Sequence, residues 1–214
     1  MYSVFEQINR KLGVPELPGA MFYDCRYALR FELGGELHPK RSIRRFMQAH
    51  GRALAISEAL FRNSAEVFVF LSSYGPSKPR LKRLRPFQYT GLKRSAFTYV
   101  AKTAQRDDDY TSEPKTALFR HWDVAKVESS NTIPEILWLG IASDIGVKPC
   151  FRSTGSAYLV DATNGLALHV YDDRGMDVAA VTARPLKELF DTYNDWLLPY
   201  DLARMTDMFG DNPS

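Results

Sequence analysis

Three carboxylates and a guanidinium lie within six residues of one another in the C-terminal half of the chain, at Asp172, Asp173, Arg174 and Asp177. Carboxylate oxygens bind divalent cations or act as a general acid and base, and an arginine can hold a phosphate or a carboxylate. However, the spacing is not that of an EF-hand loop, and aspartate and glycine are residues that a hairpin turn prefers. We therefore interpret the segment first as a turn, second as a contact for a partner, and last as a metal or hydrolase site.

A second segment, residues 78–94, combines cations with aromatic rings. Between Glu66 and Asp107 the chain has nine basic residues and no acidic one. Cations can bind a nucleic-acid backbone while aromatic rings stack on the bases. The RNP motif, the KH loop and the paired Cys/His finger are absent from the sequence, so a solvated loop, or one that lies against acidic residues, is the alternative. The candidate partner-binding cations of this segment are Lys82, Arg83 and Arg85.

Charge is distributed unevenly along the chain. Residues 1–106 contain 19 Lys and Arg against 7 Asp and Glu, whereas residues 107–214 contain 9 against 18. A separation of this size can create a surface field that steers a charged partner. If the fold interleaves the two halves, much of the field cancels.

The sequence contains no motif with a known catalytic mechanism. It lacks a Gly-x-Ser-x-Gly elbow, a His-Glu-x-x-His motif, a phosphate-binding glycine loop and a dinucleotide fingerprint. The four histidines occur singly, and the two cysteines, Cys25 and Cys150, are too few for a zinc site. We expect two reduced thiols, although a single bridge between them stays open. No cofactor, metal or enzymatic activity is predicted, but a catalytic triad assembled from distant residues would be invisible at this level.

Composition predicts one soluble domain. A chain of 214 residues with 45% hydrophobic and 25% charged residues buries enough apolar surface to fold by itself. Residues 1–12 have no apolar core of a signal peptide, and the most apolar stretch, residues 133–145, is too short for a membrane span. We therefore expect a cytoplasmic location, no membrane partner, and a frayed tail at residues 210–214.

Hydrophobic periodicity predicts several helices, which we place at residues 3–12, 42–62, 132–145, from 185 onward and 201–209. Ser42 is the expected N-cap of the second. Thr132 and Glu135 have the spacing of a capping box, Gly146 suits a left-handed helix end, and Asp201 is the expected cap of the last helix.

Alternating and β-branched residues predict strands at residues 27–33, 66–72, 97–100, 117–127, 156–161, 167–171 and 177–181. The last three form a β-meander, and we expect a positive φ at Gly165 and Gly175 in its turns. Residues 74–94 have no clean period and are predicted to form a long irregular connection. The element order favours a single α+β domain, residues 1–214, with an antiparallel sheet and several packed helices.

Three segments carry a family resemblance: RFELG at residues 30–34, YDDRGMDV at residues 171–178 and YNDWLL at residues 193–198. Together they resemble an uncharacterised bacterial domain family, over about residues 19 to 209. Small proteins of this kind are often encoded beside polymorphic or contact-dependent toxins. The resemblance therefore implies an immunity protein, and it implies no catalytic residues.

The expected function is a cytoplasmic immunity protein that binds its cognate toxin domain and covers the active site or substrate groove of the toxin. Such a protein needs a charge-complementary surface with aromatic anchors rather than catalytic groups. A basic toxin would bind the acidic half of the chain, and an acidic toxin would bind the basic segment. A nucleic-acid-binding protein, or an enzyme that uses residues 78–94, is the alternative.

Overall fold

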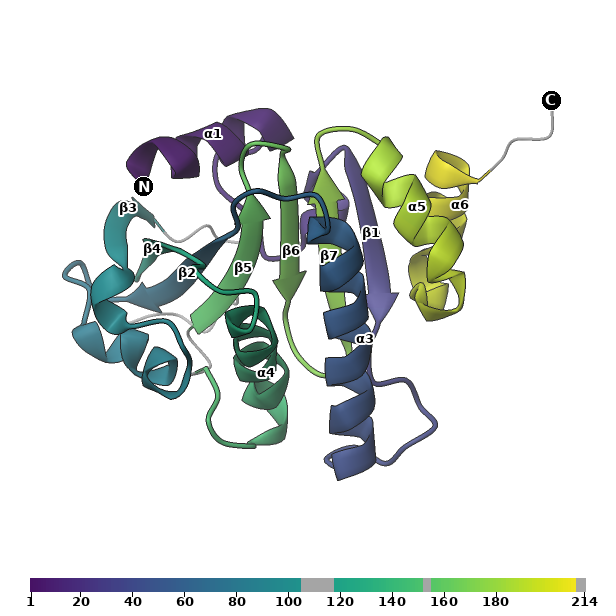
Figure 1. The fold of residues 1–214 in the computed structure, drawn as a ribbon, viewed down its shortest axis with the longest axis horizontal. Coiled ribbons are helices and arrows are strands. Elements are labelled where there is room, and N and C mark those ends of the chain that lie inside the picture. The colour runs from purple at the N-terminus through teal and green to yellow at the C-terminus, as the bar shows by residue number, and fades with distance from the viewer. Residues whose placement is uncertain (105–117, 152–154, 211–214) are drawn as a thin grey trace.

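The computed structural model of the chain describes residues 1–104, 118–151 and 155–210. Within these ranges, strands form one antiparallel sheet in the order β1-β7-β6-β5-β2-β4-β3 (Figure 1). The strands are β1 (Tyr27–Glu32), β2 (Phe68–Gly75), β3 (Thr98–Ala104), β4 (Phe119–Lys126), β5 (Gly155–Asp161), β6 (Leu166–Val170) and β7 (Gly175–Ala180). The prediction of an α+β domain with an antiparallel sheet and a C-terminal meander is confirmed.

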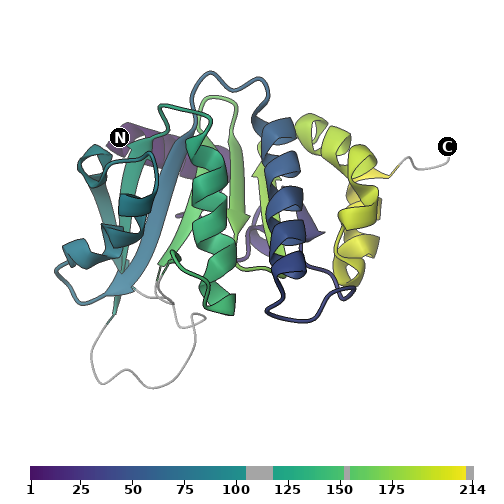
Figure 2. The ribbon, with the colours of Figure 1, turned by 60° about the horizontal axis from the view of Figure 1, so that its bottom comes forward.

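Helices cover both faces of this sheet. The α-helices are α1 (Tyr2–Leu12), α2 (Met21–Asp24), α3 (Ile43–Phe61), α4 (Thr132–Ile145), α5 (Arg184–Thr192) and α6 (Leu202–Phe209). Figure 2 shows α3 and α4 side by side across one face, while α1 crosses the other face and α5 and α6 lie beyond the β1 edge. Short 3-10 helices add η1 (Leu81–Tyr89), η2 (Arg94–Ala96), η3 (Asn194–Trp196) and η4 (Pro199–Asp201).

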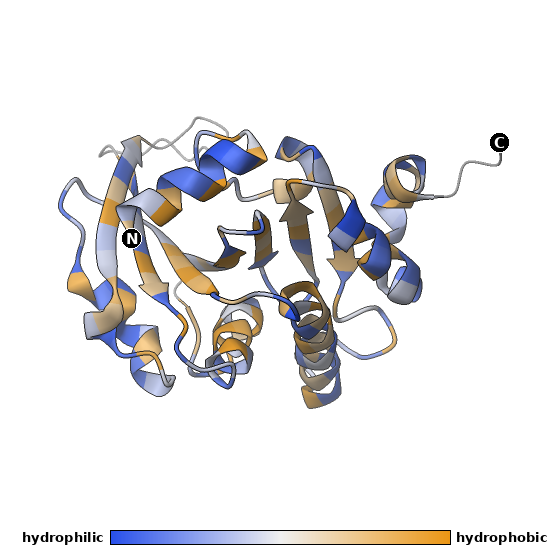
Figure 3. Ribbon diagram, turned by 45° about the horizontal axis from the view of Figure 1, so that its top comes forward, coloured by the Kyte–Doolittle hydropathy of each residue, from blue (hydrophilic) through white to orange (hydrophobic). Residues whose placement is uncertain are grey.

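The core lies in two layers, one on each side of the sheet. On the α1 side, Phe5 contacts Phe70 and Trp122 at ring-centroid distances of 5.9 and 5.4 Å. On the other side, Phe46 of α3 meets Trp138 of α4 at 4.4 Å. The central strands are largely apolar, as the orange ribbons of Figure 3 show. No helix among the described residues is both long enough and apolar enough to cross a bilayer.

The helix signals of the sequence were partly right. Ser42 caps α3, because its hydroxyl accepts a hydrogen bond from the Arg45 backbone N–H at 3.1 Å. Gly146 ends α4 at a φ of 74°, as expected. The capping box was wrong: Thr132 lies inside α4, and the Glu135 carboxylate accepts from the Gly91 N–H at 2.6 Å. A tertiary contact thus takes the group that a local motif would have used.

Two further local predictions were wrong for the same reason. Asp201 precedes α6 but does not cap it, because its carboxylate accepts hydrogen bonds from the hydroxyl of Tyr23 and from Arg30 instead. Gly165 does have a φ of 68°, whereas Gly175 is extended at the start of β7. A Cβ at Gly175 would lie 2.8 Å from the Phe31 carbonyl oxygen, so close packing explains the glycine.

Residues 74–94 form only in part the irregular connection that we predicted. β2 continues to Gly75 and η1 occupies Leu81–Tyr89, whereas residues 76–80 and 90–93 belong to no helix or strand. Leu84, Phe87 and Leu92 are buried, and the Phe87 ring lies 5.5 Å from that of Phe151. The spacing of three between the first two anchors is that of a 3-10 helix, a pattern too short to stand out in the sequence. Residue 117 of the strand predicted at 117–127, and residues 211–214 of the predicted tail, lie outside the described residues.

Candidate functional site

The carboxylates of the 172–177 turn are buried ion-pair partners. Asp177 is 0% exposed and receives two hydrogen bonds from Arg30, at 2.7 and 3.0 Å. Asp173 pairs with Arg45 of α3, and Asp172 holds the N–H and guanidinium of Arg174. Each carboxylate thus stabilises the packing of the turn.

Burial limits what this turn can offer to a ligand. Among the described residues, no three His, Cys, Asp or Glu side chains converge as a metal site would require. The side chain of Arg174 is 69% exposed, so it is the member of the turn that a partner can reach. A partner contact at Asp172, Asp173 and Asp177 stays a prediction, and their burial favours a structural role.

The three cations predicted in the basic segment have different environments. Arg83 is largely buried, and its Nε and Nη2 donate to the two Asp123 oxygens at 2.6 Å each. This bidentate pair fastens η1 to β4 and leaves little charge for a ligand. Lys82 is exposed and borders a small hollow of about 210 Å³ beside Arg80 and His121. Arg85 is exposed on a larger hollow.

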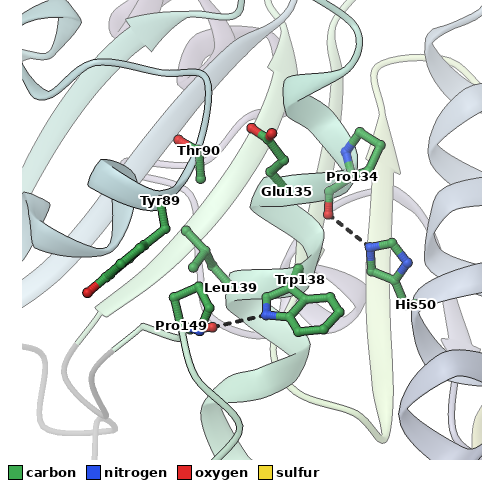
Figure 4. A pocket seen from close by; sticks show the side chains of 8 residues that line it. All are labelled: His50, Tyr89, Thr90, Pro134, Glu135, Trp138, Leu139 and Pro149. Atoms are coloured by element: carbon green, nitrogen blue, oxygen red, sulfur yellow. Dashed lines mark hydrogen bonds between the residues drawn. The ribbon is translucent and has the colours of Figure 1, made fainter. Parts of the chain in front are cut away.

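Two hollows adjoin one another beside α4: the first is lined by α4 residues, and the second by η1, Arg94 and the segment that follows α4. The first has a volume of about 310 Å³ and the second of about 730 Å³, and both are lined by Tyr89 and Pro149. We call the two together the α4 groove. Its first hollow lies between His50 of α3 and Tyr89 of η1, with Trp138 between them (Figure 4). Concave sites of this size are typical of ligand binding.

The first hollow presents apolar ring surface. The Trp138 Nε1–H donates to the Pro149 carbonyl oxygen at 3.1 Å, and the His50 Nε2–H donates to the Pro134 carbonyl oxygen at 2.9 Å. Both hydrogen bonds fix a ring by its polar atom, as the dashed lines of Figure 4 show. Trp138 also packs edge-on against Phe46, which holds the indole in place. This hollow therefore suits an aromatic or apolar group.

The second hollow is cationic. It is lined by Arg85, Arg94 and Lys148, all exposed, and the described residues around it include no carboxylate. Lys148 Nζ donates to the half-buried Cys150 Sγ at 3.1 Å. Three cations around a concave surface raise the local positive potential, because the protein walls exclude water that would screen it. This hollow therefore suits carboxylate or phosphate groups.

Of these groove residues, the sequence named Arg85 as a candidate and included Arg94 in the basic segment 78–94. Tyr89 was visible as an aromatic ring beside cations, and it is 63% exposed. His50, Trp138 and Lys148 carried no local signal, because they come from three segments that only the fold brings together.

Both cysteines are free thiols, as expected. Cys150 lies in the second hollow of the α4 groove, whereas Cys25 is buried beside α2. Burial raises the pKa of the Cys25 thiol to about 12, because the thiolate would lose its hydration there. Cys25 therefore stays protonated and acts as a small apolar side chain.

A serine and a histidine that sequence analysis missed meet on β5 and β6. His169 Nδ1–H donates to the Gly19 carbonyl oxygen at 3.1 Å, so its Nε2 accepts the hydroxyl of Ser156. The arrangement is that of a nucleophile and a base. However, burial, with the nearby charge of Arg120, lowers the pKa of His169 to about 3. So weak a base removes protons poorly at neutral pH, which favours a structural role.

The buried His169 makes a prediction about acid stability. Its pKa rises from about 3 in the folded chain to about 6.5 on unfolding, so between these values the unfolded state binds more protons. Stability is unaffected by this group above pH 6.5 and is lost as the pH falls below it. We expect a loss of about 2 kcal/mol from this residue between pH 7 and pH 5, measured by urea unfolding.

The variant His169→Gln should remove that part of the pH slope, and His38→Gln, at a half-buried site, should keep it. Equal slopes for the wild type and His169→Gln would contradict the assignment.

Comparisons with known proteins place the chain in a family. Residues 4–201 match the model of a family described as "Domain of unknown function (DUF3885)". No curated protein and no solved structure matches the chain. The matched range includes every strand described above, most of α1, all of α2 to α5 and the residues that line the α4 groove. The chain therefore belongs to the DUF3885 family of domains of unknown function.

Proposed function

We propose that this chain is a neutralising protein of the immunity type, which acts in the cytoplasm by binding a toxin domain and covering its active site or substrate groove. The observation that carries the proposal is the α4 groove, with an aromatic hollow at one end and Arg85, Arg94 and Lys148 at the other. Aromatic anchors with a charged rim are the usual composition of a protein-binding surface. The resemblance to proteins encoded beside toxins supports the same class.

The charge of the groove supports one of the two docking modes that the sequence left open. A positively charged hollow attracts an acidic partner surface and repels a basic one. We therefore propose that the toxin presents an acidic segment to the α4 groove. The immunity protein blocks the toxin by steric cover and needs no chemistry of its own.

The proposal predicts a charge-dependent complex. We expect the wild-type chain to co-purify with the toxin domain encoded by a neighbouring gene and to rescue cells that express that toxin. Reversing two exposed groove charges, Arg85→Glu with Lys148→Glu, should weaken the complex at least 30-fold and abolish rescue, because attraction becomes repulsion at the interface.

The matched control is Arg10→Glu, an exposed charge on α1 across the sheet. It should bind and rescue like the wild type. Absence of a complex at micromolar concentration, together with no rescue, would overturn the neutralising function.

A second candidate function is single-stranded nucleic-acid binding, favoured by the exposed Tyr89 ring between Arg85 and Arg94. A base can stack on the tyrosine while the cations hold phosphates. This candidate requires that affinity for an oligonucleotide falls steeply with salt and falls further in Lys82→Ala with Arg85→Ala. Flat binding curves at 50 mM salt would remove it.

A further inference from the structure

An apolar stripe on α3 leads away from the α4 groove. Ile43 is 81% exposed and Met47 is 56% exposed, although the same helix buries Phe46 and Ala49 on its inner side. His50, which lines the first hollow, follows Ile43 by seven residues and Met47 by three. In an α-helix these spacings put the three side chains on one side, in successive turns. The stripe therefore continues the apolar hollow along α3.

Such a stripe is unusual on a helix that already has a buried side. Large aliphatic side chains left in water beside an apolar hollow usually mark a contact for another molecule. The stripe spans two helical turns, or about 10 Å, from His50 to Ile43. An extended chain covers that distance in about three residues.

The surface thus has three parts in a fixed order. The α3 stripe comes first, the aromatic hollow with His50 and Trp138 second, and the cationic hollow third. Tyr89 and Pro149, shared by both hollows, join the second part to the third. Figure 4 shows His50 and Tyr89 on opposite sides of Trp138, consistent with this order. A linear ligand that fits all three parts must carry apolar, aromatic and anionic groups in that order.

We propose that the α4 groove binds a protein segment in which an aromatic residue lies between an aliphatic residue, about three positions away, and a run of carboxylates. The aliphatic side chain packs on Ile43 and Met47, the ring enters the hollow beside Trp138, and the carboxylates pair with Arg85, Arg94 and Lys148. The inference rests on the proposed function only in taking the partner to be a protein, and it specifies the chemistry of the segment that is bound.

Charge and apolarity favour a protein segment over a nucleic acid. Nucleic acid has no aliphatic group to place on Ile43 and Met47. The Glu135 carboxylate lines the first hollow, where it would repel a phosphate. Its hydrogen bond to the Gly91 N–H keeps it at the wall, so a neutral aromatic ring is tolerated there. An acidic segment with an aromatic anchor therefore satisfies both ends of the groove.

The test uses a fluorescein-labelled peptide of the order Leu-Ser-Ser-Phe-Gly-Asp-Glu-Asp-Glu and the full chain, with fluorescence anisotropy as the readout. We expect saturable binding of the peptide. Replacing its phenylalanine by serine, or its acids by amides, should weaken binding at least tenfold. Replacing the leucine by serine should weaken binding about threefold. Moving the acids between the leucine and the phenylalanine should also weaken binding, because the order of the three parts is fixed.

Variants of the protein should give the same pattern. Met47→Ser, Tyr89→Ala and Lys148→Glu change exposed side chains and should each reduce affinity for the peptide, by about threefold, fivefold and tenfold respectively. Arg10→Glu should not change it. A second readout is the modification rate of Cys150 by a maleimide, which the bound peptide should slow because the thiol lines the cationic hollow.

Four results would overturn the inference. One is peptide binding that no groove variant affects, and another is no binding below 1 mM peptide. The third is tighter binding of a 12-nucleotide single strand that depends on the same variants, which would assign the groove to nucleic acid. A toxin complex that persists in all three variants would support the neutralising function but would show that the α4 groove is not the docking site. Peptide binding without any toxin complex would support the α4 groove as a peptide site and contradict the neutralising function.

Discussion

The variant Asp177→Asn is expected to lower the free energy of unfolding by about 3 to 5 kcal/mol. Asp177 is fully buried on β7 and accepts two hydrogen bonds from Arg30 of β1, whose side chain is 12% exposed. An asparagine keeps the shape of the side chain but removes the charge. The Arg30 guanidinium then remains in a poorly hydrated site, where the desolvation cost of its charge is no longer offset by Asp177.

The loss should reach beyond one pair, because Asp177 joins three segments. Its Oδ2 also accepts the backbone N–H of Phe22 at 3.0 Å, which fixes α2 on the sheet. Urea unfolding followed by circular dichroism measures the change. Arg30→Met should lower the free energy of unfolding less in the Asp177→Asn background than in the wild type, because the two residues are coupled. The exposed Asp191→Asn, which breaks only an i,i+4 pair with Lys187, is the control. A loss below 1 kcal/mol for Asp177→Asn would contradict the assigned role.

The second large effect is expected at Glu16, in the loop that follows α1. Its buried carboxylate accepts from the Trp122 Nε1–H at 2.9 Å, the Thr103 hydroxyl at 2.7 Å and Arg120 at 3.3 Å. Glu16→Ala removes the acceptor for the indole and the hydroxyl. It also deprives Arg120 of the carboxylate that balances its charge. We expect a loss of about 3 to 4 kcal/mol in the free energy of unfolding.

A local readout separates this effect from a general loss of stability. Thr103 lies on the edge strand β3, so amide hydrogen exchange in β3 should accelerate more than exchange in β7. Glu6→Ala, an exposed carboxylate on α1, should leave both stability and exchange unchanged within about 0.5 kcal/mol. Uniform acceleration across the sheet would indicate that Glu16 does not anchor β3.

The charge asymmetry of the chain shows why sequence alone could not locate a docking face. Arg30, Arg45 and Arg83, all from the basic half, pair with carboxylates of the acidic half. Conversely, Glu16 and Glu66 of the basic half pair with Arg120 and Lys126 of the acidic half. The fold interleaves the halves because β1 lies beside β7 and β2 lies between β4 and β5. Arg85, Arg94 and Lys148 are exposed cations that line one hollow and take no part in these pairs.

Local chemistry determined the elements of this protein. The helical period and the Ser42 cap define α3, and the alternating pattern with its Gly165 turn defines the meander of β5, β6 and β7. These signals depend on residues a few positions apart, so they survive without knowledge of the fold. The family resemblance likewise came from short segments, and the match over residues 4–201 agrees with it.

Only the tertiary structure decided what the polar residues do. Asp173 and Asp177 looked like a site, but their partners Arg45 and Arg30 lie 128 and 147 residues away in sequence. Burial makes such pairs necessary, and no local pattern reports which distant guanidinium will supply the charge. The α4 groove has the same origin, since His50, Tyr89 and Trp138 become neighbours only when α3 and α4 pack on the sheet and η1 folds beside them.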